Sequence, residues 1–391
     1  MYLLFAGEAH SIKFYLVFLR QTINKLSLKC GIVGLPNVGK STLFNCLSNA
    51  KAQAANFPFC TIEPNIGVIN VPDERLWKLE SIVHPKKVVP ATVEIVDIAG
   101  LVKGASKGEG LGNQFLANIR ETDAILHVLR CFDNGNIIHV EGSVDPMRDK
   151  EIVDIELQLK DLETIEKVLQ KAARSAKTGT DNKEAKKKLE VYNAYHKCLS
   201  QQKNARTVEL PDEDKEHIKE LQLLTMKPVL YVCNVDQASL KGNKYTETVK
   251  QAVKAENAEV MIIDAAIEAE IAQLEKPEDR KEFLQEMGLD EPGVNKLIKA
   301  AYKLLSLSTY FTAGEVEVRA WTIMNGAKAP QAAGVIHTDF EKGFIKAEVI
   351  SYEDYLQYGS EQACREAGKL MIQGKDYSVR DGDVMHFRFN N

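Results

Sequence analysis

Short apolar runs alternate with amphipathic stretches between residues 28 and 305 of the chain. The run at 28–33 has the hydrophobicity of a short buried strand, and the helical spacing of apolar residues at 41–47 follows after a loop. Because strands that alternate with helices build sheets with crossover connections, we expect an α/β domain with a mostly parallel sheet. The other strand-like runs lie at 67–69, 92–96, 124–129, 229–232 and 260–263.

The strand signal stops between residues 149 and 223. Apolar residues here recur at three- and four-residue steps, which indicates a long amphipathic helix, and a turn cluster at 178–182 precedes a second stretch with the same spacing. We therefore expect an antiparallel helical hairpin inserted in the α/β domain. The apolar positions of its first helix are Ile152, Ile155, Leu159, Leu162, Ile165 and Leu169.

After residue 305 the pattern changes to short strand-like runs around one helical stretch near 352–358. This pattern predicts a small α+β module at 305–391. The α/β domain would then comprise 28–148 and 224–304, and the hairpin 149–223. The strands predicted in the module are 309–312, 315–321, 334–336 and 383–389.

Residues 1–27 precede the first clear element. Their apolar residues are interrupted by charge, and they lack a basic n-region and a small-residue cleavage site, so we expect neither a signal peptide nor a membrane anchor. We interpret them as an N-terminal extension translated from an upstream start codon.

The composition narrows the class of protein. With 391 residues, 45% of them hydrophobic and 27% charged, the chain is typical of a soluble protein with more than one domain. A net charge of -5 excludes a general polycation, although basic residues far outnumber acidic ones at 167–206, which indicates either a solvated face or a footprint for RNA. The seven cysteines form no C-x-x-C pair, which excludes a zinc cage and fits a reducing cytosol.

The strongest motif is GLPNVGKS at 34–41, which matches G-x-x-x-x-G-K-S/T between a predicted strand and a predicted helix. Its glycines let main-chain N–H groups converge on phosphate oxygens, Lys40 reaches the β- and γ-phosphates, and Ser41 can bind Mg²⁺. This is a P-loop. The predicted nucleotide-binding residues in and after it are Gly34, Asn37, Val38, Gly39, Lys40, Ser41 and Thr42.

A second motif, D-x-x-G, begins at Asp97 after the predicted strand 92–96 and ends at Gly100. In P-loop proteins an Asp here approaches the magnesium, and the Gly amide senses the γ-phosphate. Thr61 lies in the connecting segment, where a switch threonine would close on the metal. The predicted metal ligands are Ser41, Thr61 and Asp97.

These motifs resemble the YchF subfamily of Obg-related P-loop NTPases, the Obg-like ATPases. The resemblance rests on the strings at 34–45, 56–65 and 97–116 and on the stretch from YFTAG to DGDV, and it covers residues 28–391. It implies a Ras-like G domain, a coiled-coil insert and a TGS domain of β-grasp type. It further implies a cytoplasmic, Mg²⁺-dependent ATPase that hydrolyses ATP in preference to GTP. The implied partners are the ribosome, as large subunit and 70S particle, and its RNA, without DNA or membranes.

The base-recognition stretch is unusual. GTPases carry N-K-x-D, whose last carboxylate accepts from two guanine donors, whereas this chain has Asn234, Val235, Asp236 and Gln237. An amide offers one donor and one acceptor, which suits adenine and pairs poorly with guanine. Either Gln237 or main-chain groups near Val235 read the base, and the resemblance makes Asn234 a further nucleotide contact.

The catalytic group is also unusual, because Leu101 follows D-x-x-G where many GTPases have a water-orienting Gln. By resemblance the substitute is His139, whose ordinary pKa near 6.5 suits water positioning. The alternative is a packed histidine between apolar neighbours. The predicted catalytic residues are thus His139 and Lys40, and Asn37 resembles the P-loop Asn of potassium-stimulated relatives, which implies K⁺ as a further cofactor.

Two rival functions stay open at this point. One is a true GTPase of the Obg type. The other is a ribosome- or RNA-binding module whose nucleotide site is regulatory.

Overall fold

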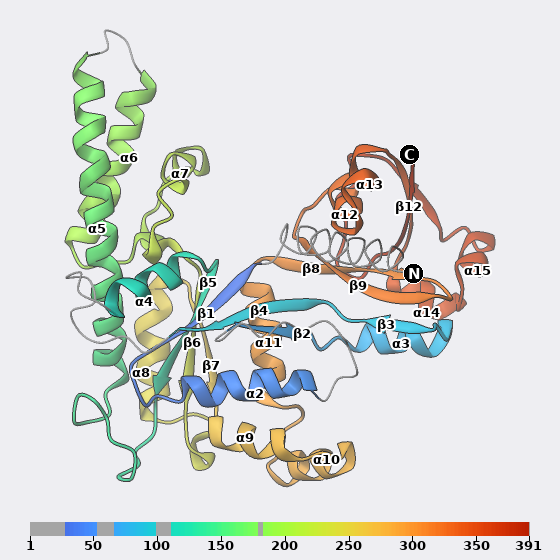
Figure 1. Cartoon of the computed structure of the whole chain (residues 1–391), viewed down its shortest axis with the longest axis horizontal. Helices are drawn as coiled ribbons and strands as arrows, with labels where there is room; N and C mark the ends of the chain where they lie inside the picture. The colour runs from blue at the N-terminus through green and yellow to red at the C-terminus, as the bar shows by residue number, and fades with distance from the viewer. Residues whose placement is uncertain (1–27, 53–65, 99–110, 179–182, 391) are drawn as a thin grey trace, which may run out of the picture. The chain divides into compact units, whose positions relative to one another are not determined.

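The computed structural model describes residues 28–52, 66–98, 111–178 and 183–390 (Figure 1). These residues form two compact units. The larger unit contains residues 29–69 and 94–305, and the smaller unit contains residues 70–93 and 306–391. The N-terminal extension, Thr61, Gly100 and Leu101 lie outside the described residues.

The larger unit is built on a six-stranded sheet with the order β2-β4-β1-β5-β6-β7. The pairs β1–β4, β1–β5, β5–β6 and β6–β7 are all parallel, which confirms the predicted mostly parallel sheet. Strands β5 and β6 are buried along their whole length, as expected for central strands covered on both faces. The strands are β1 (Lys29–Val33), β2 (Ile66–Asn70), β4 (Thr92–Asp97), β5 (Ala124–Arg130), β6 (Val229–Asn234) and β7 (Glu259–Ile263).

Helices pack onto this sheet. Helices α2, α9 and α11 contact one another, and α11 also contacts β5, β6 and β7, whereas α5 contacts β5 and α8. The helices of the α/β part are α2 (Lys40–Ala52), α4 (Leu111–Arg120), α8 (Lys244–Val253), α9 (Ala265–Gln273), α10 (Pro277–Glu286) and α11 (Gly293–Leu304).

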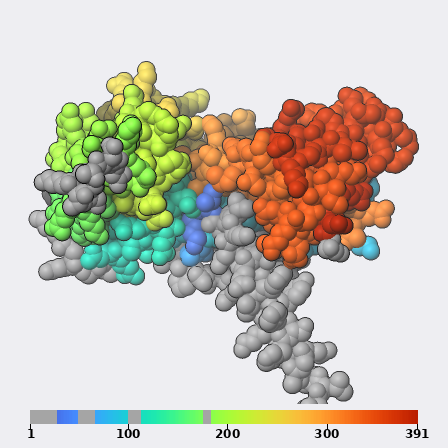
Figure 2. All heavy atoms as spheres, turned by 90° about the horizontal axis from the view of Figure 1, so that it is seen from above, coloured from blue at the N-terminus to red at the C-terminus, as the bar shows by residue number. Residues whose placement is uncertain are grey.

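The predicted hairpin is present as α5 (Pro146–Thr178) and α6 (Lys183–Ser200), which lie side by side (Figure 1). The short helices η2 (Ala205–Thr207), α7 (Asp212–Lys219) and η3 (Leu224–Met226) follow. In Figure 2 the atoms of the hairpin and of the segment that follows it, coloured green to yellow-green, lie together as one group. Its buried core consists of Ile165, Val191, Tyr195, Leu199, Ala205, Ile218 and Leu223.

The buried face of α5 differs from the predicted one near the start of the helix. Ile155 and Leu159 were expected in the core but are 39% and 45% exposed. Val153 and Leu157 are buried instead, together with Asp161, which accepts hydrogen bonds from main-chain N–H groups of η3. A different face of α5 is buried here because this end of the helix packs on the sheet rather than on α6 alone.

The smaller unit has a six-stranded sheet of order β11-β10-β12-β8-β9-β3. Its core lies between the sheet and α12, where Ala329, Ala332 and Ala333 are fully buried beside Tyr310. The strands are β3 (Lys87–Val89), β8 (Leu307–Ala313), β9 (Glu317–Met324), β10 (Phe344–Ile350), β11 (Met371–Gln373) and β12 (Val384–Phe389). The helices are α3 (Glu74–Val83), α12 (Ala329–Ile336), α13 (Thr338–Lys342), α14 (Tyr352–Tyr358) and α15 (Glu361–Glu366).

One predicted strand of this unit was wrong. Residues 334–336 are the last turn of α12, which has Pro330 in its first turn. Small alanines pack this helix closely onto the sheet, so its few large apolar residues resemble a short strand in a local pattern. Strands β10 and β11 were not predicted.

Residues 70–93, which the sequence pattern assigned to the α/β domain, pack in the smaller unit. Strand β3 pairs with β9 in parallel, with Lys87 opposite Glu317. Arg75 in α3 forms an ion pair of 2.6 Å with Asp381. The pairing joins segments far apart in the sequence, which a local pattern cannot reveal.

Among the described residues, no helix combines the length and the hydrophobicity that a bilayer crossing requires.

Candidate functional site

Those predicted site residues that the structure describes gather at one edge of the larger sheet. Strands β4, β1, β5 and β6 are neighbours and run parallel, so their carboxyl ends meet at the same edge. The P-loop follows β1, Asp97 ends β4, the loop 131–145 follows β5, and Asn234 ends β6. Four segments that are separate in the sequence therefore contribute to one site.

The P-loop requires glycine at two positions. Gly34 has φ 156°, and a Cβ there would lie 2.5 Å from the main-chain oxygen of Val128. Gly39 has φ 103°, and its Cβ would lie 2.4 Å from Asn234 Nδ2. Larger residues would push the loop away from the sheet, so both glycines of the motif are explained by close packing. Val38, within the loop, is buried, and Thr42 is exposed in the first turn of α2.

Lys40 is a buried cation under this loop. Its side chain donates a 2.7 Å hydrogen bond to the main-chain oxygen of Leu35, and the residue is only 7% exposed. Burial lowers the pKa of Lys40 to about 8, against the opposing effect of the Asp97 carboxylate. Because a buried charge is costly without a counter-charge, this position favours an anion held by the P-loop.

Ser41 and Asp97 meet as the metal prediction requires. Ser41 Oγ donates to Asp97 Oδ2 at 3.2 Å. The other oxygen, Asp97 Oδ1, is buried, and no described group donates a hydrogen bond to it. Burial raises the pKa of Asp97, while the Ser41 hydrogen bond and the Lys40 charge oppose that rise. A hydroxyl beside an unsatisfied carboxylate oxygen fits the hard oxygen ligands of Mg²⁺.

Asn234 braces the P-loop from the neighbouring strand. Its Nδ2 donates to Val38 O at 2.9 Å, and its Oδ1 accepts from Ala265 N at 3.0 Å. Val235 is buried, and its N–H donates to Ile263 O at 2.9 Å. Both predicted nucleotide contacts are thus also parts of the framework that shapes the site.

Gln237 differs from these two residues because its side chain is exposed. Its amide nitrogen lies 3.1 Å from the sulfur of Met287, a weak acceptor. The Gln237 amide is therefore the more available group for a base.

His139 lies in the loop between β5 and α5, and the preceding residue touches the P-loop. Asn37 Nδ2 donates to Ile138 O at 3.2 Å. His139 itself is buried, with Nε2 2.8 Å from Asp149 Oδ2 and with Nδ1 accepting from Glu141 N at 3.1 Å. In this structure the imidazole is packed inside the protein, and its catalytic role stays a prediction.

Two charged residues that the sequence analysis missed hold this loop. Arg130 is buried at the end of β5, and its guanidinium donates to the main-chain oxygens of Phe132, Asn134 and Ile137 at 3.0–3.2 Å. Asp149 lies in the first turn of α5. A signal for Arg130 was present in the sequence, because a charge that ends a mostly apolar strand must find buried partners. Asp149 carries no comparable signal.

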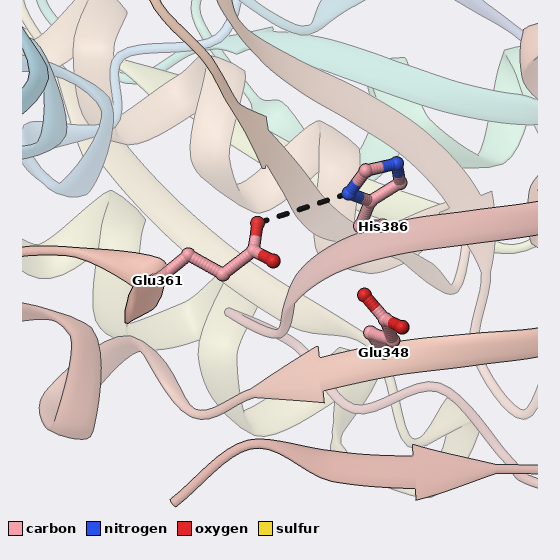
Figure 3. Close-up of side chains that lie close together, drawn as sticks. All are labelled: Glu348, Glu361 and His386. Carbon is pink, nitrogen blue, oxygen red and sulfur yellow. Dashed lines mark ion pairs between the residues drawn. The ribbon is translucent and has the colours of Figure 1, made fainter. Parts of the chain in front are cut away.

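A second cluster of titratable groups lies in the smaller unit (Figure 3). It consists of Glu348, Glu361 and His386, with His386 Nδ1 3.7 Å from Glu361 Oε2. The buried Glu348 carboxylate also lies 3.2 Å from Arg388 and 3.4 Å from Arg365. Burial raises the pKa of Glu348, but these cations outweigh it and hold the pKa below its ordinary value. Because the guanidiniums already balance the charge, we interpret the cluster as an ion-pair network rather than a metal centre.

Comparison with known proteins covers both units. A family model described as 50S ribosome-binding GTPase matches residues 29–178. The model YchF-GTPase_C, described as a protein of unknown function (DUF933), matches residues 307–390. Among solved structures, that of the Schizosaccharomyces pombe YchF GTPase has a TM-score of 0.84 and 40% identity, over 93% of this chain and 98% of that one.

Bacterial relatives match over their full length. The protein named ribosome-binding ATPase YchF from Escherichia coli O157:H7 is 57% identical over 368 residues, which cover 93% of this chain and 100% of the relative. The protein of the same name from Bacillus subtilis is 52% identical over the same shares of the two chains. Together with the P-loop at the carboxyl edge of the larger sheet, these matches show that the chain belongs to the YchF family, within the Obg-related GTPase superfamily.

Proposed function

We propose that this protein is a ribosome-binding, Mg²⁺-dependent ATPase that hydrolyses ATP, and GTP less well, to ADP and phosphate. The observation that carries the proposal is the arrangement of buried Lys40 beside the Ser41–Asp97 pair under the P-loop. The names of the full-length relatives support the nucleotide and the partner.

The predicted phosphate- and metal-binding residues each have a role in this proposal. Lys40 and the main-chain N–H groups of the P-loop would stabilise the charge that develops on the β- and γ-phosphates. Ser41, Asp97 and Thr61 would hold Mg²⁺, which when bound neutralises phosphate charge. The Gly100 amide would sense the γ-phosphate.

Two further assignments concern the attacking water and the monovalent ion. His139 would orient the water, since an alkyl side chain at Leu101 cannot. K⁺ would bind at Asn37, which predicts faster turnover in KCl than in NaCl. Equal rates in the two salts would remove K⁺ from the cofactors and leave the ATPase proposal intact.

A GTPase is the second candidate, because the matching family model and the S. pombe structure are both described by that word. The exposed Gln237 amide favours ATP, since it leaves one of two guanine donors unpaired. Leaving a donor unpaired costs about 1–3 kcal/mol, or roughly five- to 150-fold in preference.

The variant Gln237→Asp tests this argument. The carboxylate accepts from both guanine donors, so the ratio of GTP to ATP affinity should rise by roughly five- to 150-fold. Gln285→Asp, on the exposed helix α10, is a matched control. An unchanged ratio would mean that main-chain groups near Val235 read the base, and a wild-type preference for GTP would favour the GTPase.

The ribosome contact would involve the hairpin and the smaller unit. We propose that residues 149–223 act as a coiled-coil insert and residues 305–391 as a TGS module of β-grasp type, and that they meet RNA of the large subunit in the 70S particle. Salt bridges pair Lys187 with Asp214 and Lys188 with Glu184 within the protein. Lys183 and Lys186 are exposed beside them, in a position suited to RNA phosphates.

The decisive experiment combines turnover with sedimentation. Wild-type protein should release phosphate from ATP in Mg²⁺ and pellet with 70S ribosomes, with less pelleted as salt rises. Lys40→Ala should lose hydrolysis, whereas Lys281→Ala, an exposed lysine on α10, should retain it. Unchanged turnover in Lys40→Ala would contradict the assignment of the P-loop, and no pelleting at low salt would contradict the partner.

A further inference from the structure

The loop that carries His139 is held at both ends. Arg130 binds three main-chain oxygens of its first half. At its other end, Asp145 accepts hydrogen bonds from Met147 N and Arg148 N, both at 3.1 Å, and so begins α5. Arg148 also reaches back to the main-chain oxygen of Ser143 at 2.5 Å. The structure therefore fixes the path of the loop, and the position of His139 within it is a specific one.

Neighbouring residues in this loop invert the usual pattern of burial. Ile138 is 79% exposed, and Val140 is 48% exposed, while His139 between them is 8% exposed. An exposed isoleucine beside a buried imidazole is the reverse of what hydrophobicity favours. The carbonyl oxygen of Ile138 accepts a hydrogen bond from Asn37 of the P-loop, so His139 is next to the nucleotide site in the chain, but its side chain binds Asp149 and Glu141 N.

Asp149 is what holds the imidazole in this position. His139 Nδ1 accepts a hydrogen bond from Glu141 N, so Nε2 carries the proton and donates it to Asp149 Oδ2 at 2.8 Å. The other carboxylate oxygen, Asp149 Oδ1, is bound by Arg148 at 3.0 Å. Both ring nitrogens are occupied by the protein. The imidazole can contact a water at the γ-phosphate only after one of these bonds breaks, and the bond to Asp149 is the charge-assisted one.

We propose that Asp149, in the first turn of the hairpin helix α5, is a latch that holds His139 away from the nucleotide, and that its release precedes hydrolysis. The inference rests on the proposed ATPase function and assigns its regulation to a residue that does not touch substrate. The latched and released states are two conformations, and a change that weakens only the latched state shifts the population toward the released one.

The test is a double-mutant cycle in single-turnover hydrolysis, with enzyme in excess over ATP so that product release does not limit the rate. Asp149→Asn keeps the shape but removes the charge, and should raise the hydrolysis rate by at least roughly fivefold, since the His139 hydrogen bond keeps only a neutral, weaker acceptor and the latched state alone is weakened. His139→Ala should lower the rate. The double variant should hydrolyse ATP no faster than His139→Ala, and the Kd for ATP should be unchanged by Asp149→Asn.

Asp145→Asn is the matched control. It removes a carboxylate from the same helix start, but the Asn oxygen still accepts from Met147 N and Arg148 N and so keeps the loop in place, and the rate should be unchanged. A rate that falls in Asp149→Asn, or a rise that persists without His139, overturns the latch.

If Asp149→Asn does not fold, Asp149→Ser, which removes the carboxylate that accepts from His139 Nε2, should also accelerate hydrolysis. No acceleration in that folded variant overturns the latch as well. Wild-type turnover that depends on Lys40 keeps the ATPase proposal intact in each of these cases, whereas wild-type protein without Lys40-dependent turnover defeats the ATPase proposal itself.

Discussion

The side-chain amide of Asn234, at the end of β6, donates a 2.9 Å hydrogen bond to the main-chain oxygen of Val38 in the P-loop. Through its oxygen the same amide also holds Ala265, at the start of α9. One side chain thus fixes the distance between the loop expected to bind phosphates and the strand end expected to bind the base. Its effect on binding should be structural rather than base-specific.

Replacing Asn234 by Ala should weaken ATP and GTP binding by the same factor. The change leaves the buried Val38 oxygen and Ala265 N–H without their partner, at a cost of about 1–3 kcal/mol, part of which appears as lost affinity. Competition titrations with both nucleotides measure the two factors. A loss confined to one nucleotide would show that Asn234 reads the base directly.

Gly39→Ala should destabilise the P-loop itself. The new Cβ would meet Asn234 Nδ2 at 2.4 Å in a backbone conformation with φ 103°. We expect the free energy of unfolding to fall by about 1–3 kcal/mol and nucleotide affinity to fall with it. Gly374→Ala is the control, because a Cβ there meets no atom within 4 Å. Equal thermal unfolding and affinity in the two variants would contradict the packing argument.

Nucleotide binding should weaken as pH rises above 8. Burial lowers the pKa of Lys40 to about 8, so the amine loses its proton above that pH unless an anion restores it. The Kd for Mg²⁺–ATP should therefore rise, approaching about tenfold per pH unit. Calorimetry at pH 8.5 in buffers of different ionisation enthalpy should show proton uptake on binding. A Kd that is constant from pH 7 to 9.5 would contradict this role of Lys40.

The same pKa has a consequence for the protein without nucleotide. Because the pKa of Lys40 is below its ordinary value of 10.5, the folded protein binds fewer protons at this group than the unfolded chain between about pH 8 and that value. The Lys40 contribution to the free energy of unfolding should thus increase with pH across this window.

Asp97→Asn should separate metal binding from nucleotide binding. It removes the buried carboxylate that we assign to Mg²⁺ while it keeps a partner for Ser41. The Mg²⁺ concentration needed for half-maximal ATP binding should rise at least roughly tenfold, in the range seen when groups that support a metal are replaced. ATP binding in EDTA should change little. Asp279→Asn removes an exposed carboxylate from α10 of the same unit and should have no such effect.

The sequence was sufficient where the chemistry is local. The P-loop, Asp97 and the strands of the larger sheet follow from motifs and periodicity within short windows, and the structure places the described motif residues at one edge. The sequence was insufficient where contacts between distant segments decide strand pairing and side-chain burial. The pairing of Lys87 with Glu317 is one case. The burial of His139 is another, since it depends on Asp149, which lies beyond the loop.

The position of residues 70–93 in the smaller unit also sets an order of folding during synthesis. The ribosome delivers α3 and β3 early, but β9, against which they pack, is made only after the larger unit is complete. Until then Leu76 and Leu79, buried residues of α3, lack the strands β8 and β9 that α3 contacts. The growing chain thus carries a hydrophobic segment that a chaperone or an aggregate can bind, and a chain cut short at residue 305 would keep it exposed permanently.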